Sequence, residues 1–312
     1  MVLWSRTLHA GGVEDEPLRA DYTAVAQYVA RVEPLSYPAM RTVLPPAWQP
    51  HVLAALAFAK HTDDLADLPP AHRHGGRFHA WAEAVAHGLT TGSSPYALVR
   101  AFLHTAAVNG VPHAQIHDYL AGQAGNLSFT GYATDEDYYR CLHSVTVPYL
   151  ALPCISRRPG AANRINHSLL RIVADAAQRV DDLADFAADL RLGQLHFPQA
   201  TLTRFGITRA DLESGRQTPA VRAFVAHACQ QARTVMDIAQ DALRRADAEE
   251  QLLLRPPLVA KQHLLGGIER QGADIIRRTV ALNILPAPTE LLDGALRTLR
   301  ARVRVATLRA RS

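Results

Sequence analysis

The chain has 312 residues, of which 48% are apolar and 20% are charged. This composition argues against a disordered or fibrous protein and provides enough apolar residues for one large core. The three cysteines form neither an even set nor a C-x-x-C pair, which argues against a disulfide scaffold and against a zinc-thiolate site. No stretch approaches the ~18 apolar residues of a membrane span, and the first residues lack the apolar core of a signal peptide. We therefore expect a soluble, cytoplasmic protein.

The net charge of +4 arises from the last sixteen residues, which contain six arginines and no acidic residue. Without them, 27 basic residues stand against 29 acidic ones, so the rest of the chain has a net charge of −2. Arginine outnumbers lysine 31 to 2, which resembles a coding bias toward GC-rich codons. No basic stripe is interleaved with aromatic residues, so the sequence does not indicate a nucleic-acid partner. The arginine-rich tail could contact anionic lipid or cover the end of a helical domain.

Helical spacing of apolar residues runs through almost the whole chain. Residues 1–20 lack this period and are expected to form a loose arm. Asp21 is expected to cap a helix that runs through Arg31. Further helices are expected over residues 50–68, 77–89, 96–108, 113–124, 136–150, 161–192, 218–246 and 257–282, and from residue 289 onward. Strand patterns are absent, so residues 21–312 are predicted to form a single all-α domain.

One acidic pentapeptide, Asp-Asp-Leu-Ala-Asp, occurs twice, at residues 63–67 and 181–185. Residues four apart share a helix face, so the first and last aspartates of each copy point together. The second copy extends into a stripe of Gln178, Asp181, Asp185 and Asp189. Like charges at this spacing destabilise a helix by about 0.3 kcal/mol per pair, so both motifs are expected to attract cations. We name residues 63–67 the first acidic motif and residues 178–189 the second.

Clustered carboxylates without Cys or His at ligand spacing favour a hard cation, so the motifs indicate Mg²⁺ rather than Zn²⁺. Mg²⁺ held by few carboxylates keeps coordination sites for phosphate oxygens, which points to a diphosphate bridged between two helices. The alternative is that both motifs are solvated helix faces. His72, His74 and His79 follow the first motif, but no carboxylate or Cys completes a ligand set, so a solvated loop is expected there.

The segment from Gln178 to Ile207 resembles the second acidic signature of the squalene synthase/phytoene synthase family, Q-x-x-N-x-x-R-D-x-x-E-D-x-x-R-G-R-x-Y-x-P followed by Leu and F-G. The matching positions are Gln178, Asp185, Asp189, Arg191, Gly193, Pro198, Phe205 and Gly206. The first motif, preceded by Phe58 and Lys60, is similar to the family's first acidic motif. The family's intervening G-x-x-x-D-L segment and its Ser-rich entry resemble Gly122–Leu127 and Ser36-Tyr37. The likeness spans roughly residues 30 to 285.

The resemblance implies a single-domain isoprenoid synthase bundle of α-helices around a central apolar cavity. It implies that Mg²⁺ is held by Asp63, Asp64, Asp67, Asp181, Asp185 and Asp189, of which Asp63, Asp67, Asp181 and Asp185 are catalytic. It further implies that an allylic prenyl diphosphate is bound by Ser36, Tyr37, Lys60, Asn126, Gln178, Arg179 and Arg191. Lewis-acid assistance to the leaving diphosphate, in a cavity that excludes water, would then form an allylic cation.

The sequence departs from the family pattern at Asp181, Ala184, Ala188, Asn126 and His196, where Asn, Arg, Glu, Asp and Tyr are expected. The tyrosine cluster of the fifth helix reads Cys141-Leu142-His143, and no tyrosine stands near Lys261. Head-to-head condensation needs two anion sites and cation-stabilising phenols, and several of these are missing. The surviving residues suffice to activate one diphosphate.

We therefore expect a prenyltransferase of secondary metabolism that transfers one prenyl group to an aromatic, carbazole-like acceptor. His143 and His196, at family tyrosine positions, could line the cavity or accept the acceptor's proton, or could be core histidines. Arg179 and Arg191 could instead pair with nearby acids. The alternatives are head-to-head condensation of two prenyl diphosphates, terpene cyclisation and an inert helical scaffold. Donor chain length, acceptor identity and oligomeric state stay open.

Overall fold

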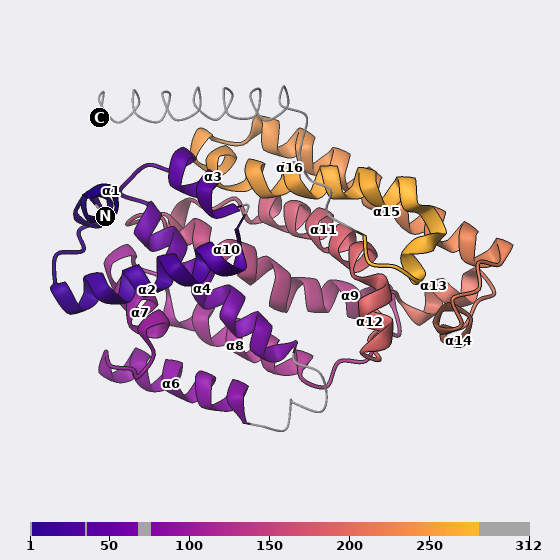
Figure 1. Ribbon diagram of the computed structural model, residues 1–312, viewed down its shortest axis with the longest axis horizontal. Helices are drawn as coiled ribbons and strands as arrows, with labels where there is room; N and C mark the ends of the chain where they lie inside the picture. Colours follow the sequence, from indigo (N-terminus) through magenta and orange to yellow (C-terminus); the bar gives the residue numbers. More distant parts are fainter. Residues whose placement is uncertain (1, 35, 68–75, 281–312) are drawn as a thin grey trace. The chain divides into compact units, whose positions relative to one another are not determined.

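The structure is a computed structural model that describes residues 2–34, 36–67 and 76–280 (Figure 1). These residues form helices and no strand, as the sequence predicts. They belong to two compact units, which we describe separately. Among the described residues, unit 1 is formed by those within 2–127 and 147–167, and unit 2 by residues 128–146 and 168–280. The helix expected from residue 289, the arginine-rich tail, His72 and His74 lie outside the described residues.

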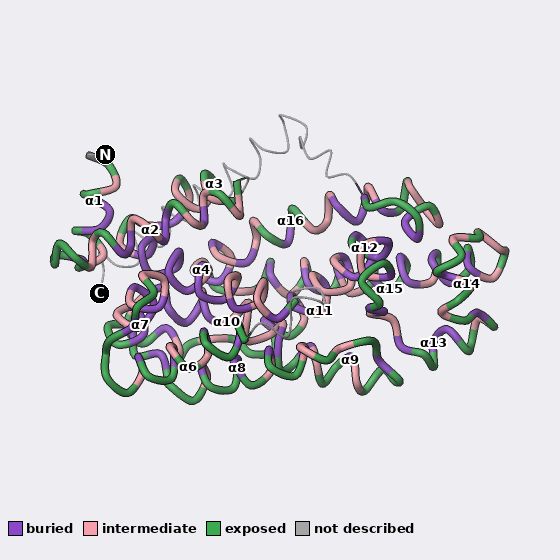
Figure 2. Tube along the Cα trace, turned by 60° about the horizontal axis from the view of Figure 1, so that its bottom comes forward, coloured by how far each residue is buried: buried purple, intermediate pink, exposed green. Residues whose placement is uncertain are grey.

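Unit 1 is built around one buried helix, α4. Its elements are α1 (Val2–Ala10), α2 (Glu16–Val32), α3 (Ser36–Val43), α4 (Gln49–Ala66), α6 (Arg77–Thr91), α7 (Ala97–Asn109), α8 (His113–Asn126), α10 (Val147–Ile155) and the short 3₁₀-helix η2 (Ala162–Arg164). Helix α4 packs against α2, α6, α7, α8 and α10. It is buried along most of its length (Figure 2). Alanines at positions 54, 55, 57 and 59 allow this close packing because they add little bulk.

Aromatic side chains form the core beside the middle of α4. The rings of Phe58 and Phe102 stack with centroids 4.0 Å apart, and the ring of Trp81 lies 6.0 Å from that of Phe58. The indole Nε1 of Trp81 donates a hydrogen bond to Thr62 Oγ1 at 2.9 Å, which satisfies the polar atom of a buried ring. These contacts fix the rotation of α4 and therefore the directions in which its last turn presents side chains.

The N-terminal residues differ from the loose arm that the sequence predicts. They form α1 and the start of α2, and Leu8 and Val13 are buried in the core of unit 1. Asp15, not Asp21, caps α2, because its side chain accepts a hydrogen bond from the backbone of Leu18. The N-terminal segment has too few apolar residues to show a helical spacing in the sequence. Burial of those few residues is still enough to hold the segment against α2 and α4.

Asp21 lies within α2 and pairs with Arg100 on α7. The guanidinium group donates from Nη2 to Asp21 Oδ1 at 2.5 Å and from Nε to Asp21 Oδ2 at 2.8 Å. A third hydrogen bond runs from Arg100 Nη1 to the backbone oxygen of Ser94 at 2.8 Å. This fork geometry joins two helices that lie side by side in unit 1.

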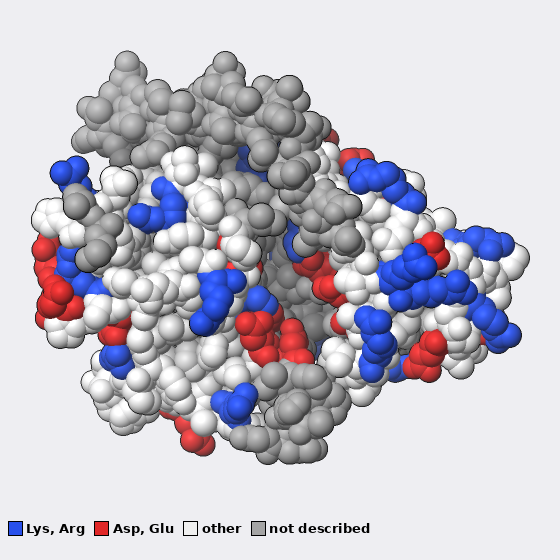
Figure 3. All heavy atoms as spheres, in the orientation of Figure 1, with Lys and Arg blue, Asp and Glu red and all other residues white. Residues whose placement is uncertain are grey.

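Unit 2 contains α9 (Asp135–Cys141), η1 (Leu142–Thr146), α11 (His167–Ala184), α12 (Phe186–Arg191), α13 (Gln199–Arg204), α14 (Arg209–Glu213), α15 (Pro219–Arg245), α16 (Ala248–Gln271) and η3 (Gly272–Ile276). The long helices α15 and α16 pack against each other, and the ring of Phe197 packs against those of Phe224 on α15 and Phe186 on α12. Basic side chains gather over the end of this unit that holds α13 and α14 (Figure 3).

Two helices expected to be continuous are interrupted. Within residues 136–150, the turn from Leu142 to Thr146 is π-helical. Within residues 161–192, helix α11 ends at Ala184, and Asp185, with φ −92° and ψ 1°, separates it from α12. Both interruptions lie next to the second acidic motif or to residues that contact it. π-Helical turns inside α-helices are frequently found at functional sites. In the part of the chain that the structure describes, no helix is long and apolar enough to cross a membrane.

Candidate active site

The first acidic motif forms the last turn of α4, where the buried face of that helix ends. Lys60 Nζ lies 2.6 Å from Asp64 Oδ1 and 3.8 Å from Asp63 Oδ2. Burial lowers the pKa of Lys60, but the hydrogen bond to Asp64 and the charges of the three aspartates outweigh burial, so the net shift is upward. Tyr28 on α2 donates a hydrogen bond to Asp64 Oδ2 at 3.3 Å. Burial and the charge of Asp64 raise the pKa of Tyr28 to about 12.

A buried glutamine from α8 holds Asp63 from the other side. Gln123 Nε2 donates to Asp63 Oδ1 at 3.0 Å and contacts the hydroxyl of Tyr119 at 3.0 Å. Tyr119 in turn donates to the backbone oxygen of Ala59 at 2.8 Å. This chain of hydrogen bonds orients the Asp63 carboxylate, and the sequence analysis missed Gln123 as a site residue. The signal in the sequence that could have indicated Gln123 is its position three residues before Asn126, a predicted substrate-binding residue in the last turn of α8.

The second acidic motif is centred on Asp182, which the sequence analysis also missed. The residue is 5% exposed, and its Oδ1 accepts a hydrogen bond from Gln178 Nε2 at 2.8 Å. Thr146, at the end of the π-helical turn, donates to Gln178 Oε1 at 2.8 Å. Burial raises the pKa of Asp182 well above its usual range, and the charges of Asp181 and Asp189 act in the same direction.

The acids of the predicted stripe have different surroundings, because α11 ends before Asp185. Asp181 forms an ion pair with Lys261 on α16. Asp185 is exposed, and Asp189 lies on α12 with its Oδ2 3.7 Å from His196 Nε2. The prediction of one continuous acidic stripe over three helical turns is therefore wrong, although all residues of that stripe lie in unit 2.

His196 lies between two acids of the second motif. Its Nδ1 is 3.7 Å from Asp182 Oδ1, and its ring packs 4.7 Å from that of Phe129. Burial lowers its pKa to about 4, so the imidazole is neutral near pH 7. His143, the other histidine considered as a base, is exposed on the π-helical turn.

Arg179 is held in place by a network of its own. Its Nε donates to Asp175 Oδ1 at 2.8 Å, and the same oxygen accepts from the Tyr138 hydroxyl at 2.7 Å. The guanidinium carbon lies 4.9 Å from the centroid of the Tyr138 ring, within cation–π range. Arg179 therefore pairs with a nearby acid, which is the alternative that the sequence analysis left open.

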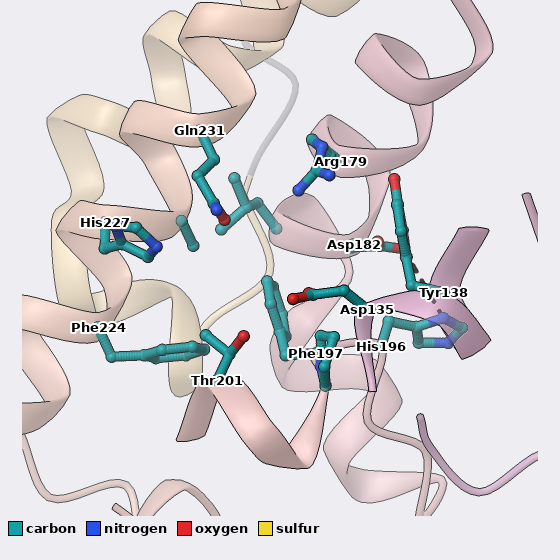
Figure 4. Close-up of a pocket in the computed structure, with 13 residues that line it drawn as sticks. Asp135, Tyr138, Arg179, Asp182, His196, Phe197, Thr201, Phe224, His227 and Gln231 are labelled. Carbon is teal, nitrogen blue, oxygen red and sulfur yellow. Dashed lines mark ion pairs between the residues drawn. The ribbon is translucent and has the colours of Figure 1, made fainter. Parts of the chain in front are cut away.

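A small pocket, with a cavity volume of about 30 Å³, lies in unit 2 beside Asp182 (Figure 4). Its aromatic lining consists of Tyr138, Phe197 and Phe224, and its polar lining includes Arg179 and His196. Figure 4 shows Arg179 and Gln231 approaching the pocket from opposite sides. The pocket thus combines aromatic walls with a few polar groups.

Of three other residues expected to bind substrate, two are exposed and one is partly buried. Ser36 is exposed at the start of α3, where its hydroxyl donates to Glu33 Oε2 at 3.0 Å. Its neighbour Tyr37 is partly buried, and Arg191 is exposed at the end of α12. His79, from the predicted solvated segment, is exposed as well.

The side chains present suit Mg²⁺ in kind, because both motifs offer carboxylate oxygens. Among the residues that the structure describes, no three His, Cys, Asp or Glu side chains gather closely enough to form a complete metal site. Lysines contact Asp64 of the first motif and Asp181 of the second, so cationic groups already lie against both. The donor set therefore fits a hard divalent cation in kind, and the six aspartates named from the sequence stay a prediction.

Comparisons with known proteins agree on a family. The model of the family "Squalene/phytoene synthase" matches residues 34–285. Phytoene synthase 3, chloroplastic, of Zea mays is 26% identical over 233 residues, which are 73% of this chain and 54% of that protein. The chain thus spans about half the length of that relative.

Solved structures show the same fold. Squalene synthase HpnC from Alicyclobacillus acidocaldarius is 21% identical with a TM-score of 0.70, and the match covers 84% of this chain and 98% of that one. A dehydrosqualene synthase in complex with ligand is 15% identical with a TM-score of 0.74, covering 92% and 98%. YisP from Bacillus subtilis is 16% identical with a TM-score of 0.65, covering 90% and 96%. The isoprenoid synthase fold expected from the sequence is confirmed, and the chain belongs to the squalene/phytoene synthase family.

Proposed function

We propose that the protein is a cytoplasmic, Mg²⁺-dependent prenyltransferase that transfers the prenyl group of an allylic diphosphate to an aromatic, carbazole-like acceptor in secondary metabolism. Membership of the squalene/phytoene synthase family supports the prenyl transfer. The observation that carries the choice of acceptor is the aromatic-lined pocket beside His196 in unit 2.

The acidic motifs supply the ligands for the metal. Asp63 and Asp67 of the first motif and Asp185 and Asp189 of the second would hold Mg²⁺, which supplies Lewis-acid assistance to the departing diphosphate. Gln123 fixes the direction of the Asp63 carboxylate through its hydrogen bond. Positioning of this kind matters because a ligand that is free to rotate must be ordered each time that substrate binds.

The lining of the pocket suits a flat acceptor in kind, although its side chains would have to move apart to admit one. The rings of Tyr138, Phe197 and Phe224 offer faces and edges against which another aromatic ring can pack. When a prenyl cation adds to an aromatic carbon or nitrogen, a carbon–prenyl or nitrogen–prenyl bond forms and the acceptor must lose one proton. His196 lines the same pocket and is the residue that we assign to accept that proton.

Head-to-head condensation of two prenyl diphosphates is the second candidate. It is favoured by the structural likeness to proteins described as squalene and dehydrosqualene synthases. It is opposed by the absence of tyrosines at positions 143 and 196, where histidines stand. A second donor would also need its own cationic contacts.

Product analysis separates these functions. Purified protein is incubated with Mg²⁺ and dimethylallyl, geranyl or farnesyl diphosphate, with and without carbazole-type acceptors, and both pyrophosphate and products are measured. A prenylated acceptor supports the proposal, whereas a C30 or C40 hydrocarbon from the donor alone contradicts it. Asp63→Ala and Asp185→Ala are expected to abolish pyrophosphate release, while Asp118→Ala, an exposed acid on α8, is expected to retain it. Release that is unaffected by EDTA would contradict the metal assignment.

A further inference from the structure

The chain contains two lysines among 33 basic residues, and each one contacts an aspartate of a different acidic motif. Lys60 precedes Asp64 by one helical turn. Lys261 lies on α16, eighty residues from Asp181 on α11, so its pairing depends on the tertiary structure of unit 2. Lysine is thus confined to two positions, and both adjoin the residues expected to handle a diphosphate.

Lysine and arginine differ in the geometry of their charge. A guanidinium group is a planar fork that matches one carboxylate, whereas an ammonium group is a compact charge with three donors pointing in different directions. One donor of Lys261 is engaged by Asp181, and the others can contact an additional anion. In a chain that otherwise uses arginine, the presence of lysine at these two sites favours that second contact.

The exposure of the pair leaves room for such an anion. The Lys261 side chain is 29% exposed and that of Asp181 is 38% exposed. Partly exposed ion pairs contribute only about 0–1 kcal/mol to folding, so stability alone explains little of why this pair exists. A cation that is fixed in direction and still reachable from solvent is suited to bind a ligand.

We propose that Lys261 binds the diphosphate of the prenyl donor beside the second acidic motif, and that Asp181 acts as its positioning residue instead of ligating metal. The proposal rests on the proposed function, because it assumes a diphosphate substrate. It differs from the expectation that Asp181 ligates metal, and it leaves Asp185 and Asp189 to hold Mg²⁺ in unit 2.

Binding can be tested without turnover, since protein labelled with ¹³C only at lysine gives two Hε–Cε signals in NMR spectra. Lys60→Arg and Lys261→Arg assign them. Titration with inorganic pyrophosphate and MgCl₂ is expected to shift the Lys261 signal saturably. A shift of the Lys60 signal alone would overturn this proposal but leave the proposed function intact. If neither signal shifts while the protein remains folded, both proposals fail.

Kinetics give an independent test. Lys261→Met is expected to raise the KM for the prenyl diphosphate about tenfold or more, because a charged hydrogen bond is lost. Asp181→Asn should raise KM less, since Lys261 remains. Arg270→Met, an exposed change on the same helix, serves as the matched control. An unchanged KM in Lys261→Met together with a lower Tm would show a merely structural pair and would overturn the proposal.

Discussion

Replacement of Asp182 by asparagine tests whether this buried carboxyl group is held in its neutral form. Asparagine has nearly the same shape and keeps an oxygen that can accept the hydrogen bond from Gln178. The pKa of Asp182 is raised by burial, so the folded protein holds the proton more tightly than the unfolded chain does. The stabilising contribution of Asp182 is therefore complete below the unfolded pKa of about 3.9 and is lost as the pH rises through the folded pKa.

The size of the effect follows from one proton. While Asp182 is protonated in the folded state and ionised in the unfolded state, the free energy of unfolding falls by about 1.4 kcal/mol per pH unit. Asp182→Asn lacks this slope and is expected to be more stable than the natural protein at pH 8.

Urea unfolding between pH 5 and 8, in EDTA, measures this difference. The control is Asp118→Asn, which removes an exposed acid from α8 and should leave the pH dependence unchanged. If Asp182→Asn were less stable than the natural protein at every pH, with the same slope, Asp182 would be ionised in the fold and the reasoning from burial would be refuted.

Three further predictions concern side chains that join helices. Asp21→Ala removes two charged hydrogen bonds to Arg100 and is expected to lower the free energy of unfolding by about 2–3 kcal/mol in urea titrations. Asp15→Ala, which removes the cap of α2, should cost about 1 kcal/mol by the same assay, and an equal loss in the two variants would contradict the roles assigned to them. Gln123→Leu should reduce metal-dependent pyrophosphate release at least tenfold by freeing the Asp63 carboxylate, whereas unchanged release would show that this hydrogen bond does not position it.

The sequence predicts the long helices well where local signals are strong. The helix expected over residues 218–246 is observed as Pro219–Arg245, because Thr218 caps it and proline suits its first turn. The helix expected over 113–124 is observed as His113–Asn126. Both acidic motifs can also be recognised from the sequence, because an exact repeat of a pentapeptide is visible without any structure. In these cases the determining contacts lie within a few residues of each other.

Features that depend on distant residues were not predictable in this way. A helical period extended through Asp185 predicts one continuous stripe, yet the chain leaves the helix at that residue. Asp182 is the adjacent acid of the same pentapeptide, and only its burial and its contact with Gln178 distinguish it from Asp181. The N-terminal segment is held by a few apolar contacts that produce no detectable period. Each of these outcomes is decided by packing and not by sequence spacing.

The lysines show how composition and structure together can identify a functional residue. In a chain with ordinary lysine content, an ion pair such as Lys261–Asp181 would be one surface contact among many, of little energetic value. Here arginine fills 31 of 33 basic positions, so each lysine is a position at which a compact ammonium group stands in place of the usual planar guanidinium group. The sequence alone can identify these two positions but cannot give Lys261 a partner eighty residues away. The fold supplies that partner, in the motif that we propose handles the diphosphate.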